Sequence, residues 1–257
     1  MIPWGAKRKL TMLLTVVISL FVIALAIMLF ASYHPPSCHD NIQNQSEFGV
    51  DCGGPCANLC KSQTLDPIVH WQRAFMVVPG VYNAVAYVEN PNSDSVVVSV
   101  PYTFSLYDTD NLLITQRSGV TFIPANKVFA IFEATIQTGS RIPARVAFSF
   151  DQSSFSWTKT KMLEPEIRIT DVALYNKSTL PLINAKLTND TFTPIHNFDV
   201  VVVIYDKAGN AQAASKTIVD MLGPNLSQTV NYSWPNKFNF NAAKIEIIPK
   251  LFAGLNY

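Results

Sequence analysis

The chain has 257 residues, of which 49% are apolar and 14% are charged. This composition excludes a disordered polyelectrolyte, and the net charge of +1 excludes a chain that binds nucleic acid through overall basicity. The length allows one large domain or two small ones.

A membrane-spanning helix is predicted close to the N-terminus. Residues 10–33 carry no charged side chain, and a helix of that length extends about 36 Å, enough to cross a hydrocarbon core of about 30 Å. We therefore expect these residues to contact membrane lipid as an uncleaved anchor. A cleaved signal peptide is the alternative, with a weak cleavage site after Ala31.

The charges before this segment predict its orientation. Lys7, Arg8 and Lys9 belong to a basic tail, residues 1–9, that contains no acidic residue. Positively charged flanks stay on the cytoplasmic side of a membrane. The sequence thus predicts a single-pass protein of the cell membrane, with its N-terminus in the cytoplasm and its later domains outside.

A polar stretch rich in cysteine, residues 34–64, follows as a predicted stalk. Its cysteines are even in number and lie in a compartment that we expect to be oxidising, so two disulfides are predicted, with all three pairings open. A zinc site of four thiolates is the alternative, although the gaps of 13, 3 and 3 residues differ from those of zinc ribbons. The cysteines are Cys38, Cys52, Cys56 and Cys60.

The same stretch is rich in side-chain oxygens, the ligands that calcium prefers. Their spacing does not follow an EF-hand loop, so a solvated loop is the alternative to a calcium site. We expect no other cofactor. The candidate ligands are Asp40, Asn41, Asn44, Glu47 and Asp51.

Residues 38–60 resemble a cysteine motif that recurs in surface proteins of archaea and uncultured bacteria. That motif reads CxDGxxNxxExGVDCGGxCxxC. In this chain, Asn41 replaces the usual glycine, and the last gap is one residue longer. The resemblance implies an exported surface protein and no particular reaction.

Residues 67–250 predict two antiparallel β-sandwiches in tandem. Runs of Val, Ile, Phe, Tyr and Thr alternate with polar residues and are separated by frequent turns. The second half repeats the first after about 98 residues, a length that suits a seven-stranded sandwich. We place the first sandwich at residues 65–155, a polar linker at 156–164 and the second sandwich at 165–252. The expected fold class is all-β, with two immunoglobulin-like sandwiches behind one transmembrane helix.

One strand motif recurs in both halves. The string Phe-Ser-Leu-Tyr-Asp at residues 104–108 has a looser counterpart at residues 202–206. The two strings resemble the FxLYD family of extracytoplasmic, immunoglobulin-like domains. The resemblance implies adhesion or scaffolding and no catalysis. The matching residues are Phe104, Leu106, Tyr107 and Asp108 in the first copy and Tyr205 and Asp206 in the second.

Strand geometry predicts a structural role for this motif. Phe104 and Leu106 share one face of a strand and should fill the core, while Asp108 ends the strand and accepts turn amide hydrogens. Asp206 should act in the same way. Asp108 and Asp110 form, in the alternative interpretation, a carboxylate pair for metal binding or acid–base catalysis.

No pattern of catalytic residues stands out in the sequence. His34, His39, His70 and His196 are not paired at helical spacing, and GxSxG and glycine-rich phosphate motifs are absent. We expect His34 at the membrane interface, His39 at the surface, His70 in a strand and His196 in a loop. We therefore predict that the protein is not an enzyme.

Surface residues provide further predictions. Trp157, in the predicted linker, is a candidate interaction residue. Five Asn-x-Ser/Thr sequons in the exported part predict N-glycosylation where the host modifies such sites. Their asparagines are Asn44, Asn176, Asn189, Asn225 and Asn231.

These features predict an interaction or structural module of the cell envelope. Its expected partners are membrane lipid and an envelope or surface protein, and no nucleic acid. One alternative is an accessory subunit of a larger membrane complex, contacted through the helix. The other is a sensor module that binds calcium or a small ligand.

Overall fold

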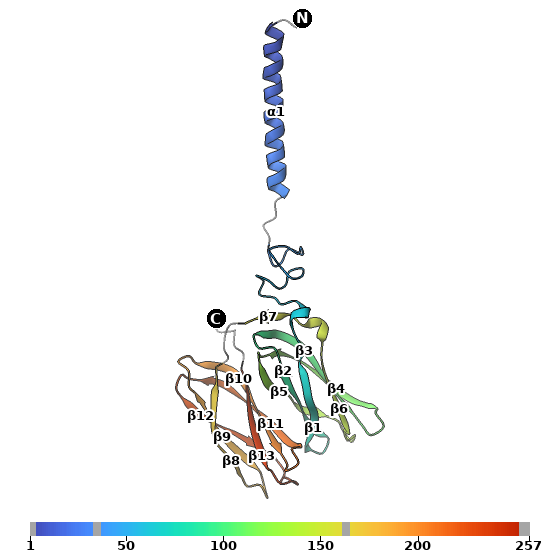
Figure 1. Cartoon of the computed structure of the whole chain (residues 1–257). Coiled ribbons are helices and arrows are strands. Elements are labelled where there is room, and N and C mark those ends of the chain that lie inside the picture. The colour runs from blue at the N-terminus through green and yellow to red at the C-terminus, as the bar shows by residue number, and fades with distance from the viewer. Residues whose placement is uncertain (1–3, 33–36, 161–164, 252–257) are drawn as a thin grey trace. The chain divides into compact units, whose positions relative to one another are not determined.

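The computed structural model describes residues 4–32, 37–160 and 165–251. Within these residues, the protein is all-β behind one N-terminal α-helix (Figure 1). The chain divides into two compact units, Met1–Pro55 and Cys56–Tyr257.

Helix α1 (Trp4–Ser32) is long and apolar enough to cross a membrane. Its 29 residues extend about 43 Å. The most apolar window has a mean hydropathy of 3.0, and none of that window is buried within the protein. The helix begins at Trp4, so Lys7, Arg8 and Lys9 lie on its first turns. Residues 4–9 of the predicted basic tail are thus helical, and their cytoplasmic location stays a prediction.

Three hydroxyl groups of α1 bond to carbonyls within the helix itself. The hydroxyl of Thr11 donates to the carbonyl of Lys7 at 3.1 Å, that of Thr15 to Met12 at 2.8 Å and that of Ser19 to Thr15 at 2.8 Å. These groups need no water, which suits a helix surrounded by hydrocarbon.

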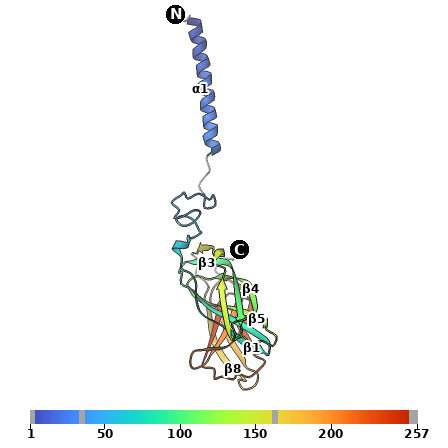
Figure 2. The same cartoon turned by 90° about the vertical axis from the view of Figure 1, so that its right-hand side faces the viewer.

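The first sandwich consists of two antiparallel sheets (Figures 1 and 2). One sheet has the order β1-β2-β5, and the other has the order β4-β3-β6 with β7 paired to β3. The strands are β1 (Ile68–Val78), β2 (Val81–Asn90), β3 (Ser95–Tyr107), β4 (Leu113–Ile123), β5 (Lys127–Gln137), β6 (Arg145–Phe150) and β7 (Trp157–Lys159). Alternate residues of β2 and β3 face each other and form its core, as the period of a strand requires.

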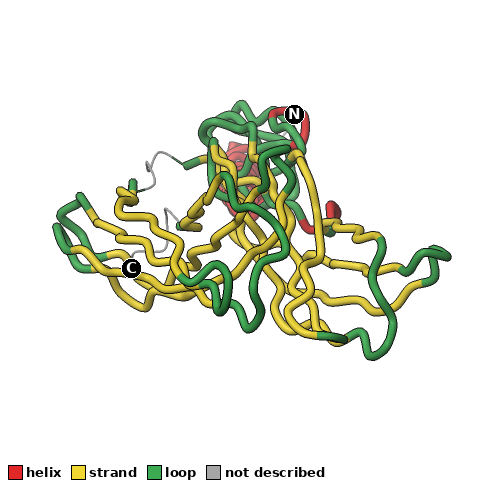
Figure 3. Tube along the Cα trace, turned by 90° about the horizontal axis from the view of Figure 1, so that it is seen from below, coloured by secondary structure: helices red, strands yellow, loops and turns green. Residues whose placement is uncertain are grey.

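The second sandwich repeats this arrangement over residues 165–251. Its sheets have the orders β12-β9-β8 and β11-β10-β13, so β8 to β13 take the places of β1 to β6. The strands are β8 (Ile167–Tyr175), β9 (Leu182–Asn189), β10 (Ile195–Tyr205), β11 (Ala211–Leu222), β12 (Ser227–Ser233) and β13 (Lys244–Lys250). Strands dominate both sandwiches, with loops at their ends (Figure 3). The described residues of this half hold six strands, one fewer than the seven expected.

The two sandwiches pack against each other through a third apolar cluster, here called the seam. Sheet β1-β2-β5 contributes Phe75, Val85 and Phe132, and sheet β11-β10-β13 contributes Val201 and Val203, among others. The seam leaves both of these sheets covered on two faces. Such strands carry continuous apolar runs instead of alternating ones.

Strand β10 illustrates this double burial. Val200, Val202 and Ile204 face the core of the second sandwich, while Val201 and Val203 face the seam. All five side chains are fully buried. The run Val-Val-Val-Val-Ile thus reflects two apolar surfaces rather than one.

Hydrogen bonds also join the sandwiches across the seam. The guanidinium of Arg73 donates to the carbonyl of Ala211 at 2.6 Å, and the hydroxyl of Tyr87 donates to the carboxylate of Glu246 at 2.9 Å. The seam therefore has both apolar and directional contacts, which favour one fixed arrangement of the two sheets.

The predicted linker at residues 156–164 is wrong for Trp157–Lys159, because these residues form β7. Strand β7 also pairs with the chain just after the cysteine segment. The amide of Leu59 donates to the carbonyl of Trp157, and the amide of Lys159 donates to that of Ala57, both at 2.8 Å. The end of the predicted stalk, residues 34–64, accordingly belongs with the first sandwich. Residues 161–164 lie outside the described part.

Candidate functional site

All four cysteines, Cys38, Cys52, Cys56 and Cys60, are disulfide-bonded. A disulfide sulfur carries no negative charge, so these residues offer no thiolate for the alternative of a zinc site. Gly54 lies in the left-handed region at φ +57°, and a Cβ there would come within 2.3 Å of the carbonyl oxygen of Ser46. The turn before Cys56 therefore requires glycine.

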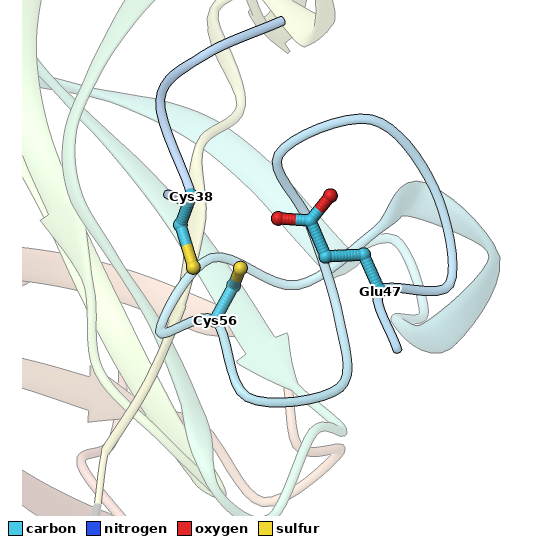
Figure 4. A group of neighbouring side chains, drawn as sticks. All are labelled: Cys38, Glu47 and Cys56. Atoms are coloured by element: carbon cyan, nitrogen blue, oxygen red, sulfur yellow. The ribbon is translucent and has the colours of Figure 1, made fainter. Parts of the chain in front are cut away.

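The carboxylate of Glu47 lies beside this cross-linked region. One of its oxygens and the sulfur atoms of Cys38 and Cys56 lie within 4.8 Å of one another (Figure 4). Glu47 is 6% exposed, and its Oε2 accepts the amide hydrogens of Asn44 and Asp51. Buried Glu47 thus stabilises the loop by accepting hydrogen bonds from its backbone.

The two aspartates among the other calcium candidates also accept hydrogen bonds from this loop. Asp51 accepts the amide hydrogens of Asp40 and Asn41, each at 2.9 Å. Asp40 accepts from the side chain of Asn44 at 2.8 Å, and this bond is the main cause that lowers the pKa of Asp40. These oxygens lie in one loop, and calcium binding by them stays a prediction.

The motif strands end in equivalent aspartate turns. Oδ1 of Asp108 accepts the amide hydrogens of Asp110 and Leu112, and Oδ1 of Asp206 accepts those of Ala208 and Asn210. The hydrogen bond from Arg141 is the main cause that lowers the pKa of Asp108, and the amide of Asn210 plays that part for Asp206.

The remaining motif residues are packed. Phe104 and Leu106 are fully buried in the first core, and Tyr205 is buried in the seam. The ring of Tyr107 lies under the guanidinium of Arg145, 4.1 Å from ring centroid to Cζ. These contacts give the motif a structural role in both halves.

Two buried asparagines fix the turn after β2 and the turn after β9. The side-chain amide of Asn90 donates to the carbonyls of Ser95 and Pro124. The side-chain amide of Asn189 donates to those of Thr193, Leu222 and Gly223. Each asparagine thus joins two separate turns of its own sandwich.

Asn189 is 0% exposed, so the predicted glycosylation at this sequon is wrong. Its amide nitrogen, the atom that would carry a glycan, is already engaged with three carbonyls. Asn176, Asn225 and Asn231 are exposed, and Asn44 is half-buried.

Two further sequence predictions need correction. Trp157 is 4% exposed and packs in the first core, so it offers no interaction surface. His196 lies in strand β10 rather than in a loop. His70 lies in β1 and contacts the carboxylate of Glu89 at 2.7 Å, while His34 lies outside the described residues.

The candidate site that the sequence did not reveal is a charged cavity beside the seam, of about 420 Å³. Both sandwiches line it. Polar or charged side chains from six strands converge there: Tyr102 (β3), Arg117 and Thr121 (β4), Glu133 (β5), Asn197 and Asp199 (β10), Lys216 (β11) and Lys250 (β13). Three strands of each sandwich thus meet at one place.

Ion pairs neutralise the two carboxylates of this cavity. Glu133 contacts Arg117 at 3.3 Å and accepts from the hydroxyl of Tyr102 at 2.5 Å. Asp199 contacts Lys216 at 3.1 Å. Burial, more than Glu133, raises the pKa of Tyr102, so its hydroxyl stays a donor. A side chain at Gly119 would collide with that hydroxyl.

Lys250 is the unusual member of the site. It is 8% exposed, and its Nζ donates to the hydroxyl of Thr121. The same Nζ lies 4.4 Å from the ring centroid of Phe122 and 5.9 Å from that of Phe129. Burial lowers the pKa of Lys250 to about 8. A sequence signal existed, because Lys250 is a lone charge in the apolar run Ile-Ile-Pro-Lys-Leu-Phe.

A second cavity, of about 430 Å³, lies at another place on the seam. Its aromatic lining consists of Trp71 and Tyr87, stacked with centroids 5.2 Å apart, and Tyr205, which meets Trp71 edge-on. Glu246 accepts from Tyr87 there and lies 3.3 Å from Lys244. Its charges are thus paired internally.

Comparison with known proteins adds little to this geometry. No protein-family model and no curated protein matches the chain. Among solved structures, the chain is similar to the crystal structure of red sea bream transglutaminase, with 12% sequence identity and a TM-score of 0.24. The match covers 69% of this chain and 30% of that chain, so this protein spans less than a third of its length. A similarity this weak supports no inference about function.

Proposed function

We propose that this chain is a membrane-anchored module of the cell envelope that works outside the cytoplasm by binding other molecules. The observation that carries the proposal is α1, an apolar helix of 29 residues without a buried residue in its most apolar window. Exposing such an apolar surface to water is unfavourable, whereas the hydrocarbon core of a bilayer solvates it. Lys7, Arg8 and Lys9 favour an N-terminus in the cytoplasm.

The disulfide-bonded cysteines support the same location. Disulfides persist in the oxidising space outside the cytoplasm and are rare inside it. The similar topology of the two sandwiches and their equivalent aspartate turns support the further proposal that both are domains of the FxLYD type. A role in holding an envelope or surface protein follows from that resemblance, and a catalytic role does not.

A thiol-labelling experiment tests the orientation. The wild-type chain has no free cysteine among its described residues, so it supplies an unlabelled background. We expect Ser178→Cys, in the exposed turn after β8, to react with a membrane-impermeant maleimide on intact cells. We expect Ala6→Cys, near the start of α1, to react only after permeabilisation. The opposite pattern, or release of the protein by alkaline carbonate, would reject the proposed topology.

Crosslinking of the full-length protein in its native membrane tests the partner. We expect a stoichiometric envelope protein joined to residues 67–250, identified by mass spectrometry of the crosslinked peptides. Crosslinks confined to residues 10–33 would instead favour an accessory subunit that is held through its helix. A chain that crosslinks to no protein at either place would contradict the interaction role.

A further inference from the structure

Three features of the chain invite a function beyond anchoring: the oxygen-rich cysteine loop, the aromatic cavity and the charged cavity. The carboxylates of the loop already accept amide hydrogens, and the charges of the aromatic cavity are paired. The charged cavity differs because its three cations share only two carboxylates. That difference points to a ligand.

The charges of this cavity do not balance. Arg117 pairs with Glu133, and Lys216 pairs with Asp199. These two pairs leave Lys250 as a surplus cation. Asp199 lies opposite Lys250 on the neighbouring strand and favours its charged form, but this carboxylate is already paired with Lys216. Among the described residues, no carboxylate forms an ion pair with Nζ of Lys250, which donates to the neutral hydroxyl of Thr121.

A buried lysine that shares a carboxylate with another lysine is rare, because an ammonium ion taken out of water loses solvation that a hydroxyl and two ring faces only partly replace. Hydrophobic residues of similar volume often replace buried charges without loss of stability. Packing alone therefore does not explain why residue 250 is a lysine. A ligand that carries a negative charge would balance the charge of Lys250.

We propose that the cavity beside the seam binds a small oxyanion, with the carboxylate or phosphate group of the ligand against the ammonium group of Lys250. The volume of about 420 Å³ suits a molecule of monosaccharide size. The hydroxyl groups of Tyr102 and Thr121 and the amide of Asn197 line the same space and suit a hydroxylated ligand.

The two sandwiches supply this site jointly. Thr121 comes from β4 of the first sandwich, and Lys250 comes from β13 of the second. A bound anion would therefore contact both sandwiches and hold the seam closed. This function goes beyond the proposed envelope role and does not depend on the orientation of the chain in the membrane.

The test uses the full-length protein in detergent micelles. D-glucuronate and inorganic phosphate are titrated by calorimetry at pH 7, and D-glucose serves as the uncharged match of glucuronate. We expect at least one of the two anions to bind and to raise the thermal midpoint, since a ligand of the native state stabilises it. Binding of glucuronate alone identifies a carboxylate ligand, and binding of phosphate alone identifies a phosphate ligand. Failure of both anions, or equal binding of glucose, would overturn the proposal.

Two variants test whether the anion binds to Lys250 itself or responds only to the overall positive charge of the protein. Lys250→Met keeps the length of the side chain and should weaken anion binding about 10-fold or more. The matched control is Lys237→Met, an exposed lysine in the turn before β13, which should leave the affinity unchanged. Equal affinity of the Lys250→Met protein and the wild type would contradict the assignment.

A pH profile of the wild-type protein provides a measurement without mutation. The charged and titratable groups that line the cavity with Lys250 are Tyr102, Arg117, Glu133, Asp199 and Lys216. Because the pKa of Lys250 is about 8, loss of its proton should weaken glucuronate binding about 30-fold between pH 7 and pH 9.5. Glucuronate stays ionised over this range, so an affinity that does not fall would argue against Lys250 as the anion contact.

Discussion

Replacing Asn189 with alanine should lower the free energy of unfolding by about 3–5 kcal/mol, among the larger effects of a single polar substitution. The side-chain amide of Asn189 donates to three carbonyls, and its Oδ1 accepts the amide hydrogen of Thr191 at 3.0 Å. Alanine would remove all four hydrogen bonds, and each buried group left without a partner costs about 1–3 kcal/mol. The carbonyls of Thr193 and Gly223 would each keep one other donor.

The matched control is Asn231→Ala, because Asn231 is an exposed asparagine of strand β12 in the same sandwich. We expect that substitution to change the free energy of unfolding by no more than about 0.5 kcal/mol. Guanidinium unfolding of the full-length chain in micelles, followed by tryptophan fluorescence, measures both. Equal denaturation midpoints for the two variants would show that the network around Asn189 adds no stability.

The equivalent residue of the first sandwich extends this prediction. Asn90 is 1% exposed, donates to the carbonyls of Ser95 and Pro124, and accepts the amide hydrogen of Asn92. Asn90→Ala should therefore destabilise the protein to a similar degree. A large difference between the two variants would mean that the sandwiches, although alike in topology, use this position differently.

The largest expected effect is that of Val203→Asp at the seam. Val203 is fully buried against the first sandwich, and its neighbours Val202 and Ile204 face the opposite side of the strand. A carboxylate there loses its hydration against apolar neighbours, so we expect a loss of about 4 kcal/mol or more. The core of the second sandwich should be less affected, because its apolar residues stay in place.

Hydrogen exchange measured by mass spectrometry distinguishes opening of the seam from global unfolding. We expect the amides of β2, β5 and β10 to exchange faster in Val203→Asp, with a smaller change in β3 and β9. Gln228→Asp, an exposed position of β12, adds the same charge at the surface and should behave as the wild type. Unchanged exchange in β2 and β5 would show that the two sandwiches do not depend on the seam.

The sequence by itself determined the features that are local. The uninterrupted apolar run predicted α1, because a helix that spans a membrane needs one continuous stretch of apolar residues. Alternation of apolar and polar residues defined the strands, and the repeat of about 98 residues recurs in the equivalent turns at Asp108 and Asp206. The boundaries were less accurate, since the start of α1 and the end of the stalk differ from those predicted.

Only the tertiary structure decided how the two halves meet. The run of five apolar residues at 200–204 in β10 is compatible with a buried strand of any kind, and the partner of its second face cannot be read from it. The same limit applies to β7, which is three residues long and lies in a polar context. Its pairing depends on β3 and on Ala57 and Leu59, far away in the chain.

The charged cavity illustrates the same limit for the candidate site. Arg117, Glu133, Asp199 and Lys250 are ordinary strand residues in the sequence, separated by up to 133 positions. Their proximity results from long-range strand pairing and from the packing of one sandwich on the other. A local pattern specifies which side of a strand a residue occupies, whereas the surroundings of that side are determined by residues distant in sequence.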